Sequence, residues 1–376
     1  MNRIRLSNGM FMAMIVNMIY AKAIGVTQGT ISRLIGQDMW IATLLGTLQG
    51  LLIIYVLHWA MRRLPGRRIT DLPSLGDALL GRWFGHLTAL ILVGFFLAGF
   101  GPIMITFVYH LKDYFLPEVP LAIFIVSGLA VGAIGCYYGL EVMGRLALLG
   151  ILFIFLLNLL IVIGSIDEFD ILNMLPVLEH GLPNALFASV HFDADWALAA
   201  MMAALVLPHA QDGLVRGGRF GAAGIAAGGV AIMIWSILEP AVLSAEVSSQ
   251  YTVSCMKLAR NAHVGTFLQR YEMIMIALYS VPVLFEIMFT LYAVSACSTR
   301  LFHLKSDKAA ILPSAIALGA FGYWIVEDHF RAIRFLENIW PWIALPVAAG
   351  LPLLMLLLRL LLQKRTERAA PYPEEG

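Results

Sequence analysis

Three ionisable residues, Lys22, Asp193 and Asp195, lie inside otherwise apolar stretches of this sequence. A charged side chain at the centre of a membrane helix costs about 2.5–3.5 kcal/mol on insertion scales, so such a residue must pair, contact water or change its protonation state. We expect Lys22 to pair with Asp193 or Asp195, which leaves the other carboxylate for the ammonium group of a ligand or for a proton. The alternative is a purely structural ion pair.

A fourth ionisable residue, Glu286, lies deep in another apolar stretch. Intramembrane acids that face the interior of a helix bundle serve in proton coupling or gating. The alternative is a buried acid that is hydrogen-bonded to a backbone carbonyl or a hydroxyl group. The sequence leaves both interpretations open.

Motifs of known catalytic and nucleic-acid-binding proteins are absent from the sequence. It contains no Walker loop, His-Glu-x-x-His or Gly-x-Ser-x-Gly pattern, so ATP hydrolysis, zinc proteolysis and serine hydrolysis have no support. Cys136, Cys255 and Cys297 are far apart and lack the spacing of zinc ligands. A net charge of +1 provides no basic surface for a nucleic-acid backbone. We therefore expect no enzyme, no cofactor, no metal and no nucleic-acid partner.

The composition is that of an integral membrane protein. Of the 376 residues, 60% are hydrophobic and 13% are charged, whereas soluble domains carry about 25% charged residues. Apolar runs, assessed in a window of about 19 residues, predict an all-α protein with ten transmembrane helices. Their approximate ranges are 9–36, 38–61, 84–111, 119–139, 143–165, 183–208, 218–243, 271–299, 309–327 and 335–361.

The distribution of basic residues predicts the orientation. With a cytoplasmic amino terminus, 17 of the 25 Lys and Arg residues fall in segments on the cytoplasmic side, as the positive-inside rule requires. An even number of spans then puts both termini in the cytoplasm. We expect one transmembrane domain over residues 1–365 and a disordered cytoplasmic tail over residues 366–376.

Ten spans divide into two sets of five, and an odd number per set gives the second set the opposite orientation. Such 5+5 inverted repeats occur in transporters whose substrate sites lie at interrupted helices. The predicted repeats cover about 9–165 and about 183–361. Helix one contains Gly25-Val26-Thr27-Gln28-Gly29, and helix six contains Ser189-Val190-His191-Phe192-Asp193-Ala194-Asp195. We expect both helices to be interrupted at these segments.

Small and aromatic residues give further expectations about packing. Four glycines near the start of helix seven have the small-x-x-x-small spacing that allows membrane helices to approach closely. They are Gly217, Gly221, Gly224 and Gly228. Pro102, flanked by Gly101, is expected to bend helix three where that helix lines the cavity. Trp340 and Trp342 are predicted to be interfacial anchors.

A set of short motifs, in a fixed order, carries a family resemblance. They are Pro65-Gly66, Leu116-Pro117-Glu118-Val119-Pro120, Gly139-Leu140-Glu141-Val142-Met143-Gly144-Arg145, Phe169-Asp170, Asn173-Met174-Leu175-Pro176-Val177 leading to Gly181, and Phe267-Leu268-Gln269-Arg270-Tyr271-Glu272. With the ten-span layout, they resemble the B-subunit of bacterial spore nutrient-germinant receptors, a branch of the amino acid, polyamine and organocation transporter superfamily. The resemblance covers nearly the full length of the chain.

The resemblance implies a LeuT-type fold, residence in the inner membrane of the spore, and partnership with an A-subunit and a lipoprotein C-subunit. It also implies binding of a small nutrient, commonly an amino acid, as the signal for germination. Lys22, Asp193 and Asp195 depart from the family pattern and favour an internal cation in place of a bound sodium ion. The alternatives are a proton-coupled amino acid permease and a scaffold subunit that binds no ligand.

Our hypothesis places a nutrient zwitterion at the membrane midplane, between helices one, three, six and eight. Its carboxylate would meet the backbone N–H groups of Gly25, Val26 and Thr27, where the second half of helix one begins. The helix dipole is positive at that point and favours an anion.

The ammonium group of the same ligand would meet carbonyl groups near Ser189, Val190 and His191, with help from Asp193. These carbonyls are predicted to end the first half of helix six. The remaining predicted site residues are Tyr20 and Phe192, which would cap the pocket, together with Lys22, Gly101, Asp195 and the coupling or gating acid Glu286.

Overall fold

A computed structural model describes residues 6–62, 69–265 and 271–369, with side chains through residue 362. Within these ranges the regular structure is helical and contains no β-strand, and Leu6 and Ala210 form an isolated β-bridge. The motif Pro65-Gly66, residues 267–270 of the last motif, and residues 370–376 of the predicted tail lie outside the described residues.

The helices follow one another with short connections. The α-helices are α1 (Asn8–Lys22), α2 (Gln28–Ile35), α3 (Met39–Met61), α4 (Leu72–Leu80), α5 (Arg82–Tyr114), α6 (Leu121–Tyr138), α7 (Leu140–Ser165), α8 (Gly181–Val206), α9 (Gly213–Leu243), α10 (Ala245–Gln250), α11 (Ser254–Asn261), α12 (Tyr271–Leu301), α13 (Asp307–Glu327), α14 (His329–Arg334), α15 (Trp340–Leu345) and α16 (Leu351–Ala369). Short 3₁₀ or π segments are η1 (Ala23–Thr27), η2 (Gly36–Asp38), η3 (Ile171–Met174), η4 (Leu207–His209), η5 (Phe335–Ile339) and η6 (Pro346–Gly350).

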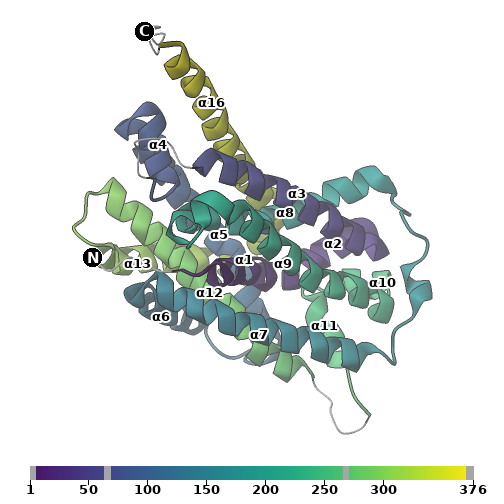
Figure 1. The fold of residues 1–376 in the computed structure, drawn as a ribbon. Helices are drawn as coiled ribbons and strands as arrows, with labels where there is room; N and C mark the ends of the chain where they lie inside the picture. Colours follow the sequence, from purple (N-terminus) through teal and green to yellow (C-terminus); the bar gives the residue numbers. More distant parts are fainter. Residues whose placement is uncertain (1–5, 63–68, 266–270, 370–376) are drawn as a thin grey trace.

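Nine helical stretches of the described chain are long and apolar enough to cross a membrane. The first, Asn8–Met61, has 54 residues, far more than the roughly 20 that one crossing needs. It turns back at Gly36, whose φ of 56° lies in the left-handed region that glycine tolerates. Counted as two spans, this stretch gives the predicted ten. Figure 1 shows α1 and α2 running across the molecule and α3 returning beside them.

The predicted interruption of helix one is confirmed. Between α1 and α2 the backbone leaves the helical region at Ile24, with ψ at 101°, and at Gly25, with φ at 152° and ψ at −123°. A Cβ atom on Gly25 would lie 2.8 Å from Cε1 of His110. Both the dihedral angles and the close contact therefore require glycine at this position.

The predicted interruption of helix six is wrong. The helix α8 continues through Ser189–Asp195 without leaving α-helical geometry. The segment contains several polar residues but neither glycine nor proline, and those two residues are what break helices. The carbonyl groups of Ser189, Val190 and His191 therefore accept hydrogen bonds within the helix and are not free for a ligand.

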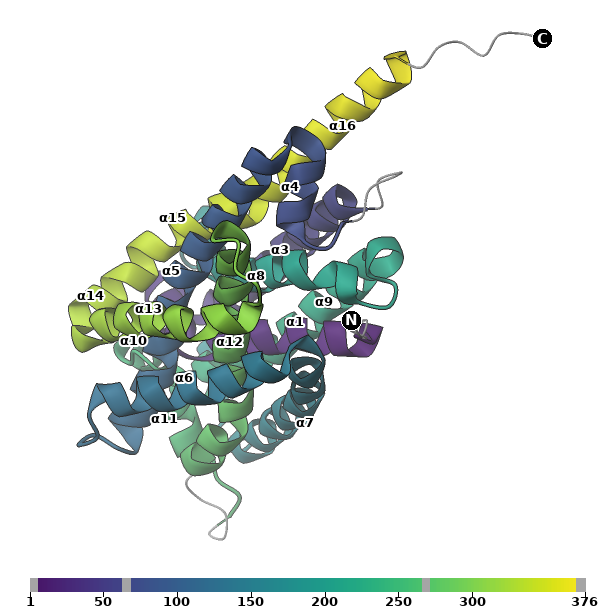
Figure 2. The same ribbon diagram turned by 90° about the vertical axis from the view of Figure 1, so that its left-hand side faces the viewer.

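The helices α1 and α8 form the centre of the bundle. From Ala13 to Lys22, every side chain of α1 is buried, and so is every side chain of α8 from Phe192 to Val206. The helix α1 packs against α7, α8, α9 and α12, and α8 also packs against α3. Figures 1 and 2 show α1 surrounded by other helices in both views. Helices that are apolar on all sides belong in such a centre.

The four glycines Gly217, Gly221, Gly224 and Gly228, which we call the glycine stripe of α9, pack as predicted. A Cβ atom on Gly221 would lie 2.7 Å from Ile54 of α3, and one on Gly224 would lie 2.9 Å from Ile15 of α1. The small residues thus bring α9 against α1 and α3 at backbone distance.

The two ends of the bundle differ in their coverings. The amino terminus and α4 lie at one end, which we call the amino-terminal face, and α10 and α11 lie at the opposite face (Figure 1).

The last turns of α16 project beyond the bundle in both ribbon views (Figures 1 and 2). The guanidinium of Arg359 in α16 donates hydrogen bonds to the carbonyls of Trp59, Ala60 and Arg62, which end α3. The helix continues to Ala369, four residues into the predicted disordered tail.

We predict that Gly224→Val lowers the free energy of unfolding by about 1–3 kcal/mol, because the new side chain overpacks the contact with Ile15. Thermal unfolding in detergent measures the change. Gly94→Val on α5 is the matched control, since a Cβ atom there has nothing within 4 Å, and it should leave the midpoint unchanged. Equal losses from the two variants would contradict the packing role of the stripe.

Candidate functional site

A buried ion pair lies at the break of the first helix. Nζ of Lys22, the last residue of α1, is 2.6 Å from Oδ1 of Asp195 on α8, and the two side chains are 0% and 1% exposed. The Lys22 ammonium also lies 4.6 Å from the ring centroid of Trp340 at the start of α15, a cation–π distance. Thr27, at the far side of the break, lies beside Asp195.

Glu286 adds a second acid to this cluster. Its side chain on α12 is 1% exposed and lies within electrostatic range of both Lys22 and Asp195. Its Oε1 atom has no hydrogen-bond partner. The fold therefore assembles one cation and two acids from α1, α8 and α12, and leaves an acceptor atom of Glu286 unsatisfied inside the bundle.

The carbonyl groups released by the break are satisfied by Tyr279 of α12. Its hydroxyl donates to the carbonyl oxygen of Ile24 at 2.9 Å and also contacts that of Ala21. The Tyr279 ring stacks on His110 of α5, with centroids 4.9 Å apart. Nε2 of His110 lies 3.4 Å from Sγ of Cys255 on α11. These aromatic and polar contacts hold the broken segment in one position.

The connection that carries α10 and α11 covers the second half of the first helix. A Cβ atom on Gly29 would lie 2.7 Å from the carbonyl oxygen of Tyr251 and 2.8 Å from that of Thr252. The hydroxyl of Ser254 donates to the buried carboxylate of Glu239 on α9. Next to Gly29, the side-chain amide of Gln28 is fully buried, and neither its nitrogen nor its oxygen has a hydrogen-bond partner.

Asp193 does not face the break. Residues two positions apart on an α-helix point about 200° apart, so Asp193 and Asp195 cannot both face Lys22. Asp193 instead points at Gln49 of α3. In the amide orientation that satisfies both groups, the Gln49 nitrogen donates hydrogen bonds to both carboxylate oxygens of Asp193, and it lies 2.7 Å from Oδ1.

Two other predicted residues of α8, Ser189 and Phe192, also lie against α3. The Ser189 hydroxyl lies 3.4 Å from the side chain of Gln49. Phe192 stacks on Trp196, and its Cβ lies 2.9 Å from the position that a Cβ on Gly46 would occupy. This half of the predicted site is therefore an interface between α8 and α3.

The remaining predicted residues lie in different surroundings. Tyr20 is buried, and its hydroxyl accepts a hydrogen bond of 3.1 Å from Nε1 of Trp235, which also donates to Asn158. His191 is half-buried and within electrostatic range of Lys22. Val190 is also half-buried, and Gly101 packs against Phe335, Phe321 and Ile325, away from the break.

Several residues of the site were missed by sequence reasoning. Trp340 was predicted to be an interfacial anchor, but it is 1% exposed and lies over Lys22, whereas Trp342 is 76% exposed. Tyr279 and His110 are polar residues within long, mostly apolar helices, whereas Gln28 belongs to the segment 25–29 at which the break is predicted. For Tyr279 and His110, polarity was the available signal, but no spacing linked them to the break.

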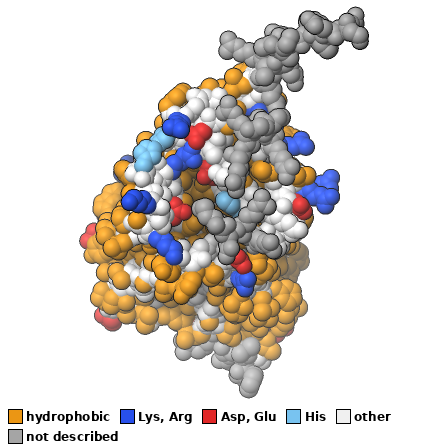
Figure 3. Space-filling model, turned by 60° about the vertical axis from the view of Figure 1, so that its left-hand side comes forward, with side chains coloured by type: hydrophobic (Ala, Val, Ile, Leu, Met, Phe, Trp, Pro, Cys, Tyr) orange, Lys and Arg blue, Asp and Glu red, His pale blue; other side chains and the backbone are white. Residues whose placement is uncertain are grey.

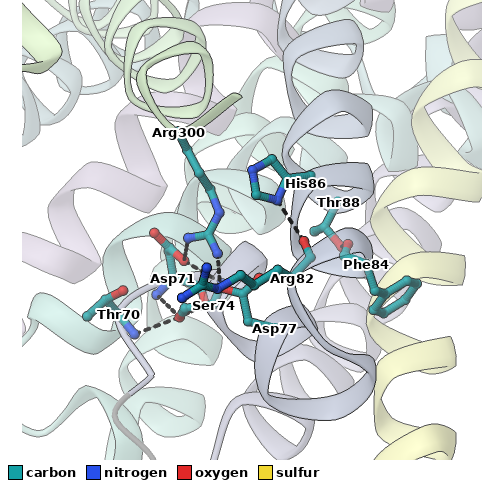
Figure 4. Close-up of polar contacts among 9 residues, drawn as sticks. All are labelled: Thr70, Asp71, Ser74, Asp77, Arg82, Phe84, His86, Thr88 and Arg300. Atoms are coloured by element: carbon teal, nitrogen blue, oxygen red, sulfur yellow. Dashed lines mark hydrogen bonds and ion pairs between the residues drawn. The ribbon is translucent and has the colours of Figure 1, made fainter. Parts of the chain in front are cut away.

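Ion pairs join helices at both ends of the bundle. At the opposite face, Arg33 of α2 lies 2.7 Å from Glu337 of η5. At the amino-terminal face, Arg300 at the end of α12 pairs with Asp77 and lies 3.8 Å from Asp71, the capping residue of α4. Figure 4 shows Arg300 reaching down between these two acids. The break therefore lies between two bridged ends.

We predict that Asp195→Asn lowers the free energy of unfolding by about 3–5 kcal/mol, because it leaves the buried ammonium of Lys22 without its partner. The double variant Lys22→Met/Asp195→Leu should recover most of that loss, since apolar replacement of a buried pair is often neutral. Thermal unfolding in detergent compares the three proteins. A double variant that is less stable than Asp195→Asn would contradict this account of the pair.

Comparisons with known proteins agree with this architecture. Among curated proteins, spore germination protein KB of Bacillus subtilis (strain 168) is 23% identical over 98% of both chains. Spore germination protein YndE of the same organism is 23% identical over 85% of this chain and 86% of its own.

Solved transporters share the fold. Mhp1, a nucleobase-cation-symport-1 family transporter in a closed conformation with bromovinylhydantoin bound, gives a TM-score of 0.71 at 13% identity, covering 93% of this chain and 78% of its own. A Na⁺-coupled sialic acid symporter in a substrate-bound outward-open state gives a TM-score of 0.61 at 13% identity. This match covers 90% of this chain and 78% of the symporter. The predicted LeuT-type membrane fold is thereby confirmed.

The decisive comparison is with a family model. The model described as "Spore germination protein" matches residues 5–327, which is most of the chain. The chain is therefore a multi-pass membrane protein that belongs to the spore germination protein family.

Proposed function

We propose that this protein is the subunit of a nutrient germinant receptor that binds a small zwitterionic nutrient, of the amino acid class, at the break of the first helix. The observation that carries the proposal is the cluster of Lys22, Asp195 and Glu286 beside a fully buried break in the first helix. Membrane proteins keep such costly groups in their interior mainly for function.

The second half of the first helix supports an anion site. Thr27, the residue before α2, makes no side-chain cap hydrogen bond, so its own hydroxyl does not satisfy the first N–H groups of that helix. The positive end of the helix dipole favours a carboxylate there. The unpartnered amide of Gln28 lies in the first turn of the same helix and is suited to donate to the same carboxylate.

Glu286 is suited to bind the ammonium group of the ligand. Since the carbonyl groups of Ser189, Val190 and His191 are engaged in α8 and Asp193 contacts Gln49, the ammonium group is better matched to the unsatisfied Oε1 atom of Glu286. The ligand would then lie across the break, between α2 and α12.

Signalling would follow from a shift between two conformations. A ligand can move that equilibrium only by its differential affinity for the two states. The ion pairs of Arg33 and Arg300 bridge different helices at the two faces, and each would be made in one state and broken in the other. In this proposal the A-subunit and C-subunit read the change in the spore inner membrane, and both termini lie in the cytoplasm.

We predict that Glu286→Gln weakens nutrient binding by roughly 10- to 100-fold, the range of a hydrogen bond to a charged group. Binding is measured by calorimetry on the chain in nanodiscs, with the nutrient identified from the germination response that spores lose without this gene. Asp193→Asn is the matched control, because it makes the same acid-to-amide change on the α3 side of α8, and its affinity should stay within about twofold. Equal affinities for wild type and Glu286→Gln would overturn the assigned role of Glu286.

A proton-coupled permease is the second candidate, and the burial of Glu286 favours it. An acid near Lys22 and Asp195 can take up and release a proton as the surrounding charges move. A permease would accumulate labelled amino acid in proteoliposomes under a pH gradient, and Glu286→Gln would abolish accumulation while keeping exchange. Saturable binding without flux would support the receptor. A ligand-free scaffold subunit would show neither.

A further inference from the structure

A long groove runs along the flank of the bundle, between α6 and α13. Its larger part has a volume of about 540 Å³, and a second part of about 530 Å³ continues it toward the amino-terminal face. The two parts share Ala133 and Leu312. Figure 2 shows α6 and α13 near each other, on the side of the molecule away from α9.

Small residues create this groove. Ala130 and Ala133 of α6 face Ala315 and Gly319 of α13, so the two helices leave a channel where larger side chains would have met. The groove opens outward among exposed apolar side chains such as Val126 and Ile316. In a membrane protein this surface faces acyl chains rather than water.

The end of the groove at the amino-terminal face is lined by one lysine, Lys308, and two tyrosines, Tyr137 and Tyr138. Nζ of Lys308, in the first turn of α13, lies 3.6 Å from the ring centroid of Tyr137 near the end of α6. Both residues line the second part of the groove. Figure 3 looks obliquely onto this face, where Lys and Arg side chains, with Asp and Glu side chains among them, lie above a flank of hydrophobic side chains.

We propose that this groove binds one acidic phospholipid, with an acyl chain along the small residues and the phosphate at Lys308. From Ala122 to Tyr137 the channel is about 22 Å long at 1.5 Å per residue. This exceeds the roughly 15 Å half-thickness of the hydrocarbon core that one acyl chain spans. Basic pockets between membrane helices bind acidic headgroups, whereas an apolar partner helix offers no anion to Lys308.

The test uses the full chain in detergent and titrates two lipids with identical acyl chains. Phosphatidylglycerol and phosphatidylcholine are added in turn, thermal unfolding is followed, and native mass spectrometry counts the retained lipids. We expect one retained lipid and a half-saturating concentration about fivefold lower for phosphatidylglycerol, the effect of one basic residue near an anion. Equal responses to the two lipids would overturn the proposal.

Two pairs of variants separate the headgroup from the chain. Lys308→Gln should remove the preference for phosphatidylglycerol, while Lys112→Gln on α5, with the same charge change outside the groove, should keep it. Ala320→Phe, which fills the groove, should abolish the retained lipid, while Val131→Phe on an exposed site of α6 outside the groove should not. If Ala320→Phe left lipid retention intact, the groove would be free for another occupant, such as a partner helix, and the proposal would fail.

Discussion

The position of Lys22 in the middle of the bundle constrains everything around it. An ammonium group removed from water needs an anion at contact distance, so α8 must present Asp195 at the end of α1. Its other neighbours, the Trp340 ring and the Glu286 carboxylate, come from α15 and α12. Four helices that are distant in sequence therefore converge on one charge, and the break of the first helix lies at their meeting point.

The membrane spans could be predicted from the sequence because their signal is local. A run of about 20 apolar residues can be recognised as a membrane span without knowledge of the fold. The ten predicted ranges match the observed helices closely. The break at Gly25 was also predictable, since two glycines within five residues weaken any helix. In contrast, the second break predicted from the cluster of polar residues in α8 is absent, because polarity alone does not interrupt a helix.

The site was only half predictable, for a geometric reason. Sequence reasoning expected Lys22 to meet an acid of helix six, but it could not choose between Asp193 and Asp195, because that choice depends on the rotation of α8 about its own axis. Tyr279 and Trp340 reach the break from elements more than 250 residues away in sequence. No pattern within their own helices indicates that contact, and only the packed bundle reveals it.

The opposed directions of Asp193 and Asp195 have a mechanical consequence. Asp195 is bound to α1 and Asp193 to α3, so α8 cannot rotate about its axis without losing both contacts. The glycines of α9 hold that helix at backbone distance from α1 and α3 as well. These contacts join α1, α3, α8 and α9 to one another, so a displacement of the four helices together against α5, α12 and α13 would keep them, whereas a rearrangement within the group would break them.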